Sequence, residues 1–284
     1  MVRFATLDRP LWPRVVRALA ALGFNAIDVP VVWREHETPD GQWDFTTERR
    51  ALDAFLQSVA DEGLKAIVRL GPWPTSDVTS LGLPDRVLYD RACQARTRRQ
   101  NPVMVLDLPR LTPLPSVASR AYRAEAARWV SAASEVIAPR VTSGQVVRVV
   151  IGHGPPAVLR DDPFEFDHHP DARVENTQPV TPPHEPTGAA LAEVDREARH
   201  AREFLDALAN AARAAGVTDG VLTYAVPGGA LISPLALALS RDRRVALAAP
   251  PSRAGTLGIW RAMRHASALP VSPHIDLRAG NPPF

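Results

Sequence analysis

The stretches GFNAIDVPVVWREHE (residues 23–37) and LDAFLQSVADEGLKAIVRLGP (residues 52–72) decide the fold of this chain. Apolar residues recur at helical spacing over residues 52–59, which predicts a helix with one buried face. Residues 26–32 and 65–70 are short, apolar and rich in β-branched side chains, as is typical of buried strands. The two stretches together therefore predict strand, helix, strand.

The same alternation continues along the rest of the chain. Strands that alternate with helices imply parallel pairing and right-handed crossovers. The sequence predicts an α/β fold, a (β/α)8 TIM-type barrel within a single domain over residues 1–284, with an open sheet as the alternative. Its first strand is shortened to residues 2–4, and its eighth strand is missing after Asp276. Further helices are expected over residues 11–22, 122–137, 190–215, 231–239 and 256–268, and further strands over residues 145–151, 221–226, 245–249 and 271–275.

Two long loops follow predicted strands and are rich in proline, over residues 71–120 and 152–186. Barrel enzymes carry their chemistry on the loops that follow strands. Within the second loop, residues 174–188 are expected to form a flexible Pro-rich loop.

Composition excludes several classes of protein. The 284 residues are 45% hydrophobic, enough for a sizeable core, and the net charge of +2 is spread along the chain, which argues against nucleic acid as a partner. The single Cys93 cannot form an internal disulfide, and neither a secretory leader nor an apolar run of spanning length is present. We therefore expect a cytoplasmic protein without membrane contact or cofactor.

One glycine motif resembles a nucleotide-binding site only superficially. Gly152, Gly154 and Ala157 fit a dinucleotide-binding pattern, but Pro155 and Pro156 remove backbone N–H groups that a pyrophosphate needs, so we disfavour it.

Residues 167–171 are rich in possible metal ligands, namely Asp167, His168, His169 and Asp171. Such a loop more often binds its own backbone through aspartate, and we predict no metal. Cys93 lies in an arginine-rich loop, but no histidine that could serve as its base is near in sequence.

Tryptophans close to the strand ends are candidate platforms for a sugar ring, whose faces are apolar. These are Trp33, Trp43 and Trp73. For Trp43 and its neighbour Phe45 we favour an ordinary place in the core.

The order, spacing and residue types from residue 4 to residue 84, including TPDGQWDF (residues 38–45) and LGLP (residues 81–84), resemble the β-galactosidase glycoside hydrolases of family 35 and their relatives in family 42. The resemblance continues more loosely through residues 115–130, 145–151 and 159–172. The matching positions are Gly23, Asn25, Trp33, His36, Glu37, Gly63, Arg69, Gly71, Pro72, Gly82 and Pro84.

The resemblance implies a retaining reaction with two glutamates at the barrel mouth. The acid/base glutamate falls on Gly154, which carries no acid, and the nucleophile falls on Asp276, which is one methylene shorter. His153 is the one neighbour able to donate a proton instead.

The resemblance also implies carbohydrate contacts, with a β-galactoside-like ligand. Pro30 replaces a tyrosine of the family, while Ser76 and Asp77 stand where the family has Ala-Glu. The residues assigned to substrate binding are Trp33, Glu37, Trp73, Ser76 and Asp77.

We therefore interpret the chain as a glycoside hydrolase with weak or lost activity. The alternatives are a non-catalytic carbohydrate-binding or regulatory relative, a fragment of a longer enzyme, or a gene remnant. The missing barrel ends also predict an open seam through which the chain could self-associate.

Overall fold

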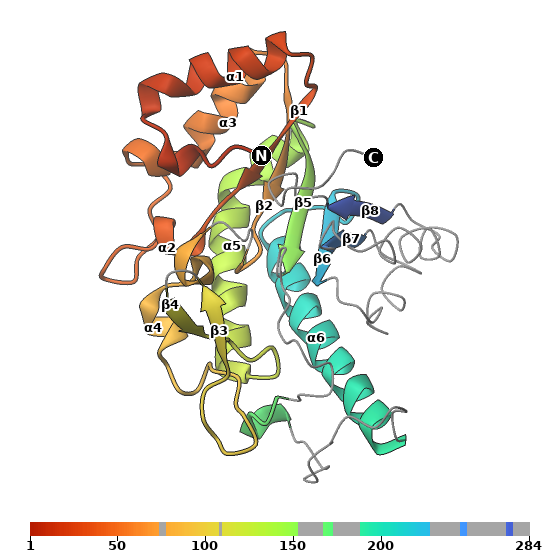
Figure 1. The fold of residues 1–284 in the computed structure, drawn as a ribbon. Helices are drawn as coiled ribbons and strands as arrows, with labels where there is room; N and C mark the ends of the chain where they lie inside the picture. Colours follow the sequence, from red (N-terminus) through yellow and green to blue (C-terminus); the bar gives the residue numbers. More distant parts are fainter. Residues whose placement is uncertain are drawn as a thin grey trace, which may run out of the picture.

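A computed structural model describes residues 1–73, 78–107, 110–152, 167–172, 188–227, 245–248 and 271–274. Its main feature is a sheet of six parallel strands whose spatial order follows the chain (Figure 1). These strands are β1 (Ala26–Pro30), β2 (Lys65–Arg69), β5 (Val146–Gly152), β6 (Leu222–Pro227), β7 (Val245–Ala248) and β8 (Val271–His274).

The six strands expected from residue 26 onward and their parallel pairing are confirmed, with ends that differ by one or two residues from the expected bounds. The described strands show no reversal of order, the feature at which doubly wound sheets bind nucleotides. They form one open run from β1 to β8, so closure into a barrel stays a prediction.

The predicted first strand is not formed as a strand. Val2 N–H donates to Asp28 O at 2.7 Å, the kind of contact that a strand beside β1 would make. The chain then turns into the 3-10 helix η1 (Phe4–Thr6), whose Phe4 is fully buried. The contact with β1 is therefore limited to Val2, and the chain continues with Phe4 in the core.

Four long helices pack on the sheet and on one another. They are α1 (Trp12–Ala21), α3 (Leu52–Asp61), α5 (Arg120–Thr142) and α6 (Gly188–Ala214). α3 contacts β2, and α5 and α6 contact both β5 and each other, as Figure 1 shows. The helices expected over residues 231–239 and 256–268 lie outside the described residues, as does the expected loop over residues 174–188 apart from Gly188.

α5 continues beyond its expected end at residue 137. Pro139 lies inside its last turn, and Ser143 N–H donates to Pro139 O at 3.0 Å, so the turn closes after the proline. At the other end, Ser119 caps the helix by accepting the N–H of Tyr122 at 3.1 Å.

Several short elements were not expected from the sequence. An antiparallel hairpin, β3 (Met104–Asp107) with β4 (Arg110–Pro113), stands within the loop between β2 and α5. The others are α2 (Trp33–His36), α4 (Asp85–Leu88), and the 3-10 helices η2 (Arg9–Leu11), η3 (Glu48–Arg50), η4 (Thr79–Gly82) and η5 (Pro170–Ala172).

An aromatic cluster fills the core around the beginning of the chain. Phe4 stacks on Phe55 with ring centroids 4.9 Å apart, and Trp33 stacks on Trp129 of α5 at 5.9 Å and 1° between planes. We define the aromatic cluster as Phe4, Trp12, Trp33, His36, Phe45, Phe55 and Trp129. The expectation of a core place for Trp43 and Phe45 is confirmed, since Phe45 is buried and Trp43 is partly buried against the core.

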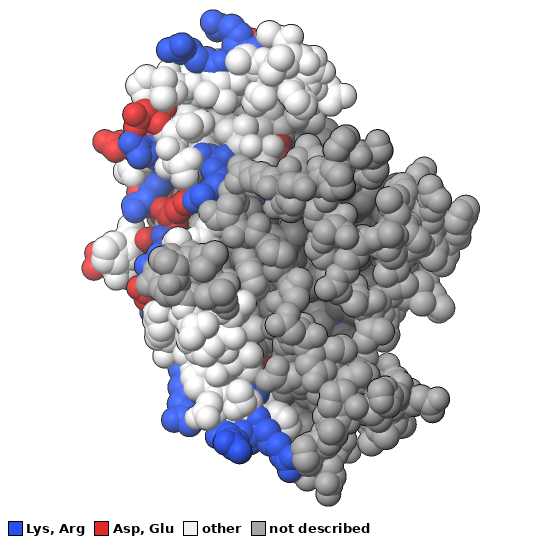
Figure 2. Space-filling model, in the orientation of Figure 1, with Lys and Arg blue, Asp and Glu red and all other residues white. Residues whose placement is uncertain are grey.

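The charged side chains are distributed unevenly over the face drawn in Figure 2. Basic and acidic groups alternate along the flank that carries α2 and α4, while basic groups gather at the lower end. Among the residues that the structure describes, none of the helices combines the length and the apolar character that a membrane span needs.

Candidate functional site

Parallel strands bring their carboxyl ends to one edge of the sheet, and the predicted site residues follow those ends along the chain. β1 ends at Pro30, three residues before Trp33, and β2 ends at Arg69, four residues before Trp73. β5 ends at Gly152, immediately before His153. Ser76, Asp77, His153, Gly154 and Asp276 themselves lie outside the described residues, so their grouping with Trp33, Glu37 and Trp73 stays a prediction.

Trp33 connects the loop after β1 to helix α5. Its side chain is fully buried, with Trp129 stacked on it and the Arg86 guanidinium 6.0 Å from its ring centroid. Trp129 in turn donates its indole N–H to Leu70 O at 3.0 Å, directly after β2. Since no face of Trp33 is exposed, contact with a sugar would require its neighbours to move.

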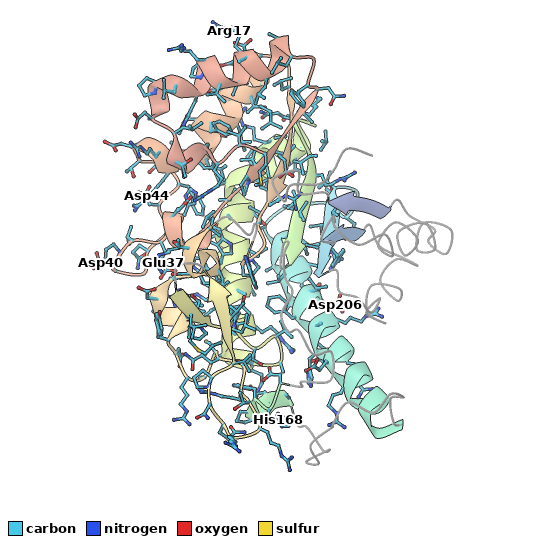
Figure 3. The ribbon with its side chains drawn as sticks, in the orientation of Figure 1. Arg17, Glu37, Asp40, Asp44, His168 and Asp206 are labelled. Atoms are coloured by element: carbon cyan, nitrogen blue, oxygen red, sulfur yellow. The ribbon has the colours of Figure 1, made fainter. Side chains whose placement is uncertain are left out.

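Glu37 lies at the end of α2, beside the loops that follow β1 and β2 (Figure 3). Its side chain is 5% exposed. Its carboxylate accepts the Trp33 indole N–H at 2.5 Å and two N–H groups of Arg86, from Nε and, at 3.1 Å, from Nη2. A carboxylate offers about four acceptor positions, so one remains for any further donor.

Arg86 extends this arrangement to α5. Its Nη1 donates to Glu125 Oε2 at 2.6 Å, and Arg128 donates to the other oxygen at 2.9 Å. Burial alone would raise the pKa of Glu125, but the bonds and charges of the two arginines outweigh it and hold that pKa low. The hydrogen bond to Glu37 likewise raises the pKa of Arg86. We call Glu37, Arg86, Glu125 and Arg128 the Glu37 cluster.

The loop after α2 is held by a turn that sequence reasoning missed. Asp44 accepts the backbone N–H groups of Thr46 and Thr47, both at 3.0 Å, and a bond from Arg50 at 3.1 Å. Burial would raise the pKa of Asp44, but these bonds and that from the Thr47 hydroxyl lower it overall. An aspartate followed by two threonines is a turn signal that could have identified this arrangement.

His36 anchors the same loop from within the aromatic cluster. Its Nδ1 bonds Asp44 O at 2.9 Å, and the backbone N–H of Asp44 donates to His36 O at 2.8 Å. Burial lowers the pKa of His36 to about 4, so the ring is neutral near pH 7. With Nδ1 donating to a carbonyl, Nε2 is an acceptor that has no partner among the described residues.

The carboxyl ends of β2, β5 and β6 meet backbone against backbone. A Cβ on Gly71 would lie 1.8 Å from Gly152 O, and one on Gly152 would lie 2.7 Å from Ala225 O. Gly152 also has a φ of +104°, which a residue with a side chain rarely adopts. These glycines therefore set how closely the three strands approach one another at the end of β5. Trp73, two residues beyond Gly71, is buried at the same edge of the sheet.

A largely buried ion pair, which the sequence pattern did not indicate, joins β1 to β2. Arg69 binds both oxygens of Asp28, with Nε 2.8 Å from Oδ1 and Nη2 2.7 Å from Oδ2. The side chain of Arg69 is 8% exposed and that of Asp28 is 20% exposed. The two opposite charges neutralise each other. The ion pair therefore holds together β1 and β2, the strands whose loops carry Trp33 and Trp73.

The ligand-rich segment serves its own backbone and its neighbours. Asp167 Oδ1 accepts the N–H groups of Arg96 and His169, both at 2.9 Å, and its other oxygen accepts the Ser116 hydroxyl at 2.5 Å. Asp171 binds the backbone N–H of Arg120 at 2.9 Å, at the start of α5. The described residues contain no group of three or more side chains arranged to hold a metal ion.

Cys93 is buried and has little nucleophilic character. Burial, with the charge of nearby Asp90, raises the pKa of its thiol to about 12. The thiol is thus protonated at physiological pH, whereas attack requires the thiolate.

Comparison with known proteins links the beginning of the chain to a glycoside hydrolase family. Residues 2–104 match the model of Glycosyl hydrolases family 35. Beta-galactosidase-1-like protein 2 of Homo sapiens is 30% identical over 107 residues, which are 38% of this chain and 17% of that protein. Beta-galactosidase-1-like protein 3 of Rattus norvegicus is 28% identical over 119 residues, 40% of this chain and 19% of that protein. The chain thus matches less than a fifth of the length of these relatives.

Solved structures extend the likeness in fold to most of the chain. Beta-galactosidase from Bacillus circulans sp. alkalophilus has a TM-score of 0.65 at 11% identity, covering 93% of this chain and 42% of that chain. Beta-galactosidase from the psychrophilic Marinomonas ef1 has a TM-score of 0.57 at 15% identity, covering 86% and 39%. The predicted resemblance to β-galactosidase-like glycoside hydrolases is confirmed.

Proposed function

We propose that this chain is a β-galactosidase-like glycoside hydrolase of carbohydrate metabolism that takes a β-galactoside-like ligand. The match of residues 2–104 to the family 35 model carries the proposal, because it covers β1, β2, the loop after β1 and the loop after β2 as far as residue 104. Loops in these positions carry the chemistry of barrel enzymes.

The reaction that we propose follows the retaining scheme. The Asp276 carboxylate attacks the anomeric carbon, the glycosidic bond to the leaving oxygen breaks, and water then releases the sugar from the carboxylate. Gly154 cannot protonate the leaving oxygen, and loss of a general acid typically costs 10² to 10⁴ in rate. His153, which follows β5 directly, is the proposed replacement donor. The expected activity is therefore low.

We further propose that the loops after β1 and β2 bind the carbohydrate together. Their strands pair along their whole length, from Ala26 with Lys65 to Pro30 with Arg69, so the loops start side by side. Trp73, Ser76 and Asp77 follow β2, while the Glu37 cluster and the aromatic cluster hold the loop after β1 in place. In this proposal Trp33 and Glu37 act mainly by positioning that loop.

An activated aryl β-galactoside tests the nucleophile, because a good leaving group needs little protonation and bypasses the missing acid at Gly154. We expect slow turnover that Asp276→Ala abolishes. The matched control is Asp40→Ala, which removes an exposed carboxylate from the loop after α2 and should leave the rate unchanged. Turnover that survives Asp276→Ala would contradict the assignment of Asp276.

Glycine at the acid/base position favours a second candidate function, a non-catalytic carbohydrate-binding relative. Saturable binding of a β-galacto-oligosaccharide with no release of product over long incubation would support it. A Gly154→Glu, Asp276→Glu double variant separates the two candidates further. Activity gained by this variant would show that the missing carboxylates alone had silenced an otherwise competent site.

A further inference from the structure

Three exposed arginines lie within nine residues of one another and form no ion pair with any residue that the structure describes. They are Arg91, Arg98 and Arg99, which we call the arginine rim. Most other arginines of the described part pair with carboxylates, which makes this loop different. The paired ones include Arg3, Arg17, Arg34, Arg49, Arg50, Arg69, Arg86, Arg120, Arg123, Arg128, Arg140 and Arg213.

Two of these arginines stand at the centre of a closed turn. Thr97 N–H donates to Asn101 O and Gln100 N–H donates to Thr97 O, both at 2.8 Å. The Thr97 hydroxyl oxygen accepts the N–H of Asn101 at 3.2 Å, and Gln100 has a φ of +63°. The turn thus presents Arg98 and Arg99 from a backbone that is fixed in advance, which reduces the entropy lost on binding.

The turn is also fastened to a distant segment of the chain. His168 N–H donates to Arg96 O at 2.9 Å, and the Gln100 side chain donates to His168 O at 3.1 Å. Asp167 secures the same place by accepting the N–H of Arg96. These contacts join residues about seventy positions apart and hold the arginine rim on a rigid support.

A fourth arginine adds buried positive charge beneath the rim. Arg96 is 3% exposed, and its guanidinium donates to Arg91 O at 2.6 Å. Burial and the charge of Arg91 lower the pKa of Arg96, while Asp167 opposes them. Placing like charges together costs folding free energy. Among the described residues, Asp167 offsets part of this cost at Arg96, but no carboxylate pairs with the three exposed arginines, so the rim is suited to an external anion.

The location of the rim is compatible with a role at the candidate site. Figure 1 places this loop beyond the carboxyl end of β5, on the side of the sheet where the predicted site residues follow their strands. In Figure 2 the basic side chains gather at the same end of the molecule, where His168 is labelled in Figure 3.

We propose that the arginine rim binds acidic groups of a saccharide, so that the chain takes glycans bearing carboxylate or sulfate groups. This inference rests on the proposed function for the saccharide part of the ligand. The arginine fork matches planar carboxylates and sulfate oxygens with paired hydrogen bonds. A net charge of only +2 gives little of the long-range attraction that nucleic acid binders use, which favours a short acidic glycan.

Calorimetry with three trisaccharides tests the proposal: trigalacturonate, a sulfated β-galactotriose and neutral β-galactotriose. We expect the full chain to bind at least one acidic sugar about tenfold more tightly than the neutral sugar at low salt, with the preference shrinking as salt rises. Comparison of the two acidic sugars distinguishes carboxylate from sulfate. An Arg98→Gln, Arg99→Gln double variant should lose the preference and keep its binding of the neutral sugar.

An Arg14→Gln, Arg199→Gln double variant is the matched control, because both side chains are exposed and carry the same charge elsewhere. Equal affinity for acidic and neutral sugars, or equal loss in both double variants, would overturn the proposal. Tighter binding of single-stranded DNA of similar charge would also overturn it. Acidic preference without turnover of any galactoside would retain the rim and refute the proposed hydrolase.

Discussion

The Glu37 carboxylate accepts N–H groups from two side chains while almost wholly buried, which sets the cost of removing its charge. We expect Glu37→Gln to lower the free energy of unfolding by about 1–3 kcal/mol, since Arg86 loses a charged partner and a side-chain amide replaces one acceptor oxygen. Urea denaturation measures the change.

Glu35→Gln is the matched control for that measurement. Glu35 lies two residues earlier and pairs with Arg3 at 2.6 Å, but its side chain is 27% exposed, so the expected loss is below about 1 kcal/mol. Equal losses in the two variants would show that burial of the Glu37 cluster adds nothing to the ordinary value of a surface pair.

Individual contacts were the part least accessible to sequence reasoning. The pattern placed Glu37 after a strand end but could not show that Arg86, forty-nine residues later, occupies its oxygens. The pairing of Asp28 with Arg69 was equally hidden, because it depends on the register of β1 and β2. Contacts within one loop were easier to predict. Asp167 accepts hydrogen bonds from backbone N–H groups, which agrees with the interpretation of its loop as one that binds its own backbone.

At the scale of elements, the close approach of β2 to β5 is the most demanding feature of the sheet. We expect Gly71→Ala to cost more than about 3 kcal/mol or to prevent folding, because the new methyl group would overlap the Gly152 carbonyl and only backbone movement could relieve it. Thermal or urea denaturation measures the loss.

Gly220→Ala makes the same chemical change where a Cβ would meet nothing within 4 Å and where φ is not positive. Its stability should stay within about 0.5 kcal/mol of the parent chain. If Gly71→Ala were tolerated equally well, the two strands would lie further apart than the structure places them.

The long periodic elements were predictable, and the short ones were not. Six strands and four helices follow from runs of apolar residues whose period is set by the buried face. The hairpin β3–β4 has four residues per strand and lies in a proline-rich loop, so neither its length nor its composition indicates a strand. η1 stands where the first strand was expected, and its Phe4 is buried in the aromatic cluster and stacks on Phe55.

At the scale of the whole molecule, His36 couples stability to pH. Its folded pKa of about 4 is below the ordinary value of 6.5, so the unfolded chain binds the proton more readily between these values. The stability contributed by His36 is therefore complete above pH 6.5, falls by up to about 3 kcal/mol as the pH drops toward 4, and changes no further below that pH.

Urea denaturation across pH 4 to 7 measures this dependence. His36→Gln removes the titrating group, so its curve should be flatter than that of the parent chain over that window, whatever its absolute stability. Parallel curves would mean that His36 is not the group responsible. The contribution of Asp44 is distinct, because its lowered pKa makes it act below pH 4.

The open run of strands bears on self-association, which we continue to propose. On β1, Val2 occupies one edge position and Pro30 lacks an N–H, so few hydrogen bonds would hold a second chain at this edge and association through it would be weak. We expect association that weakens on dilution, measured by light scattering across a hundredfold range of concentration. A single monomer mass throughout that range would contradict the prediction.

The stacking of tryptophans around α5 has a consequence for spectroscopy. Five of the six tryptophans fall within the first 129 residues, and four of them, Trp12, Trp33, Trp43 and Trp129, are in ring contact within or beside the aromatic cluster. Intrinsic fluorescence will therefore follow chiefly the opening of this half of the chain. Helix α6 and strands β6 to β8 contain no tryptophan, so only Trp260, between β7 and β8 in the sequence, would report on their unfolding by fluorescence, whereas far-ultraviolet dichroism would record all of them. Divergence between the two signals would reveal halves that melt separately.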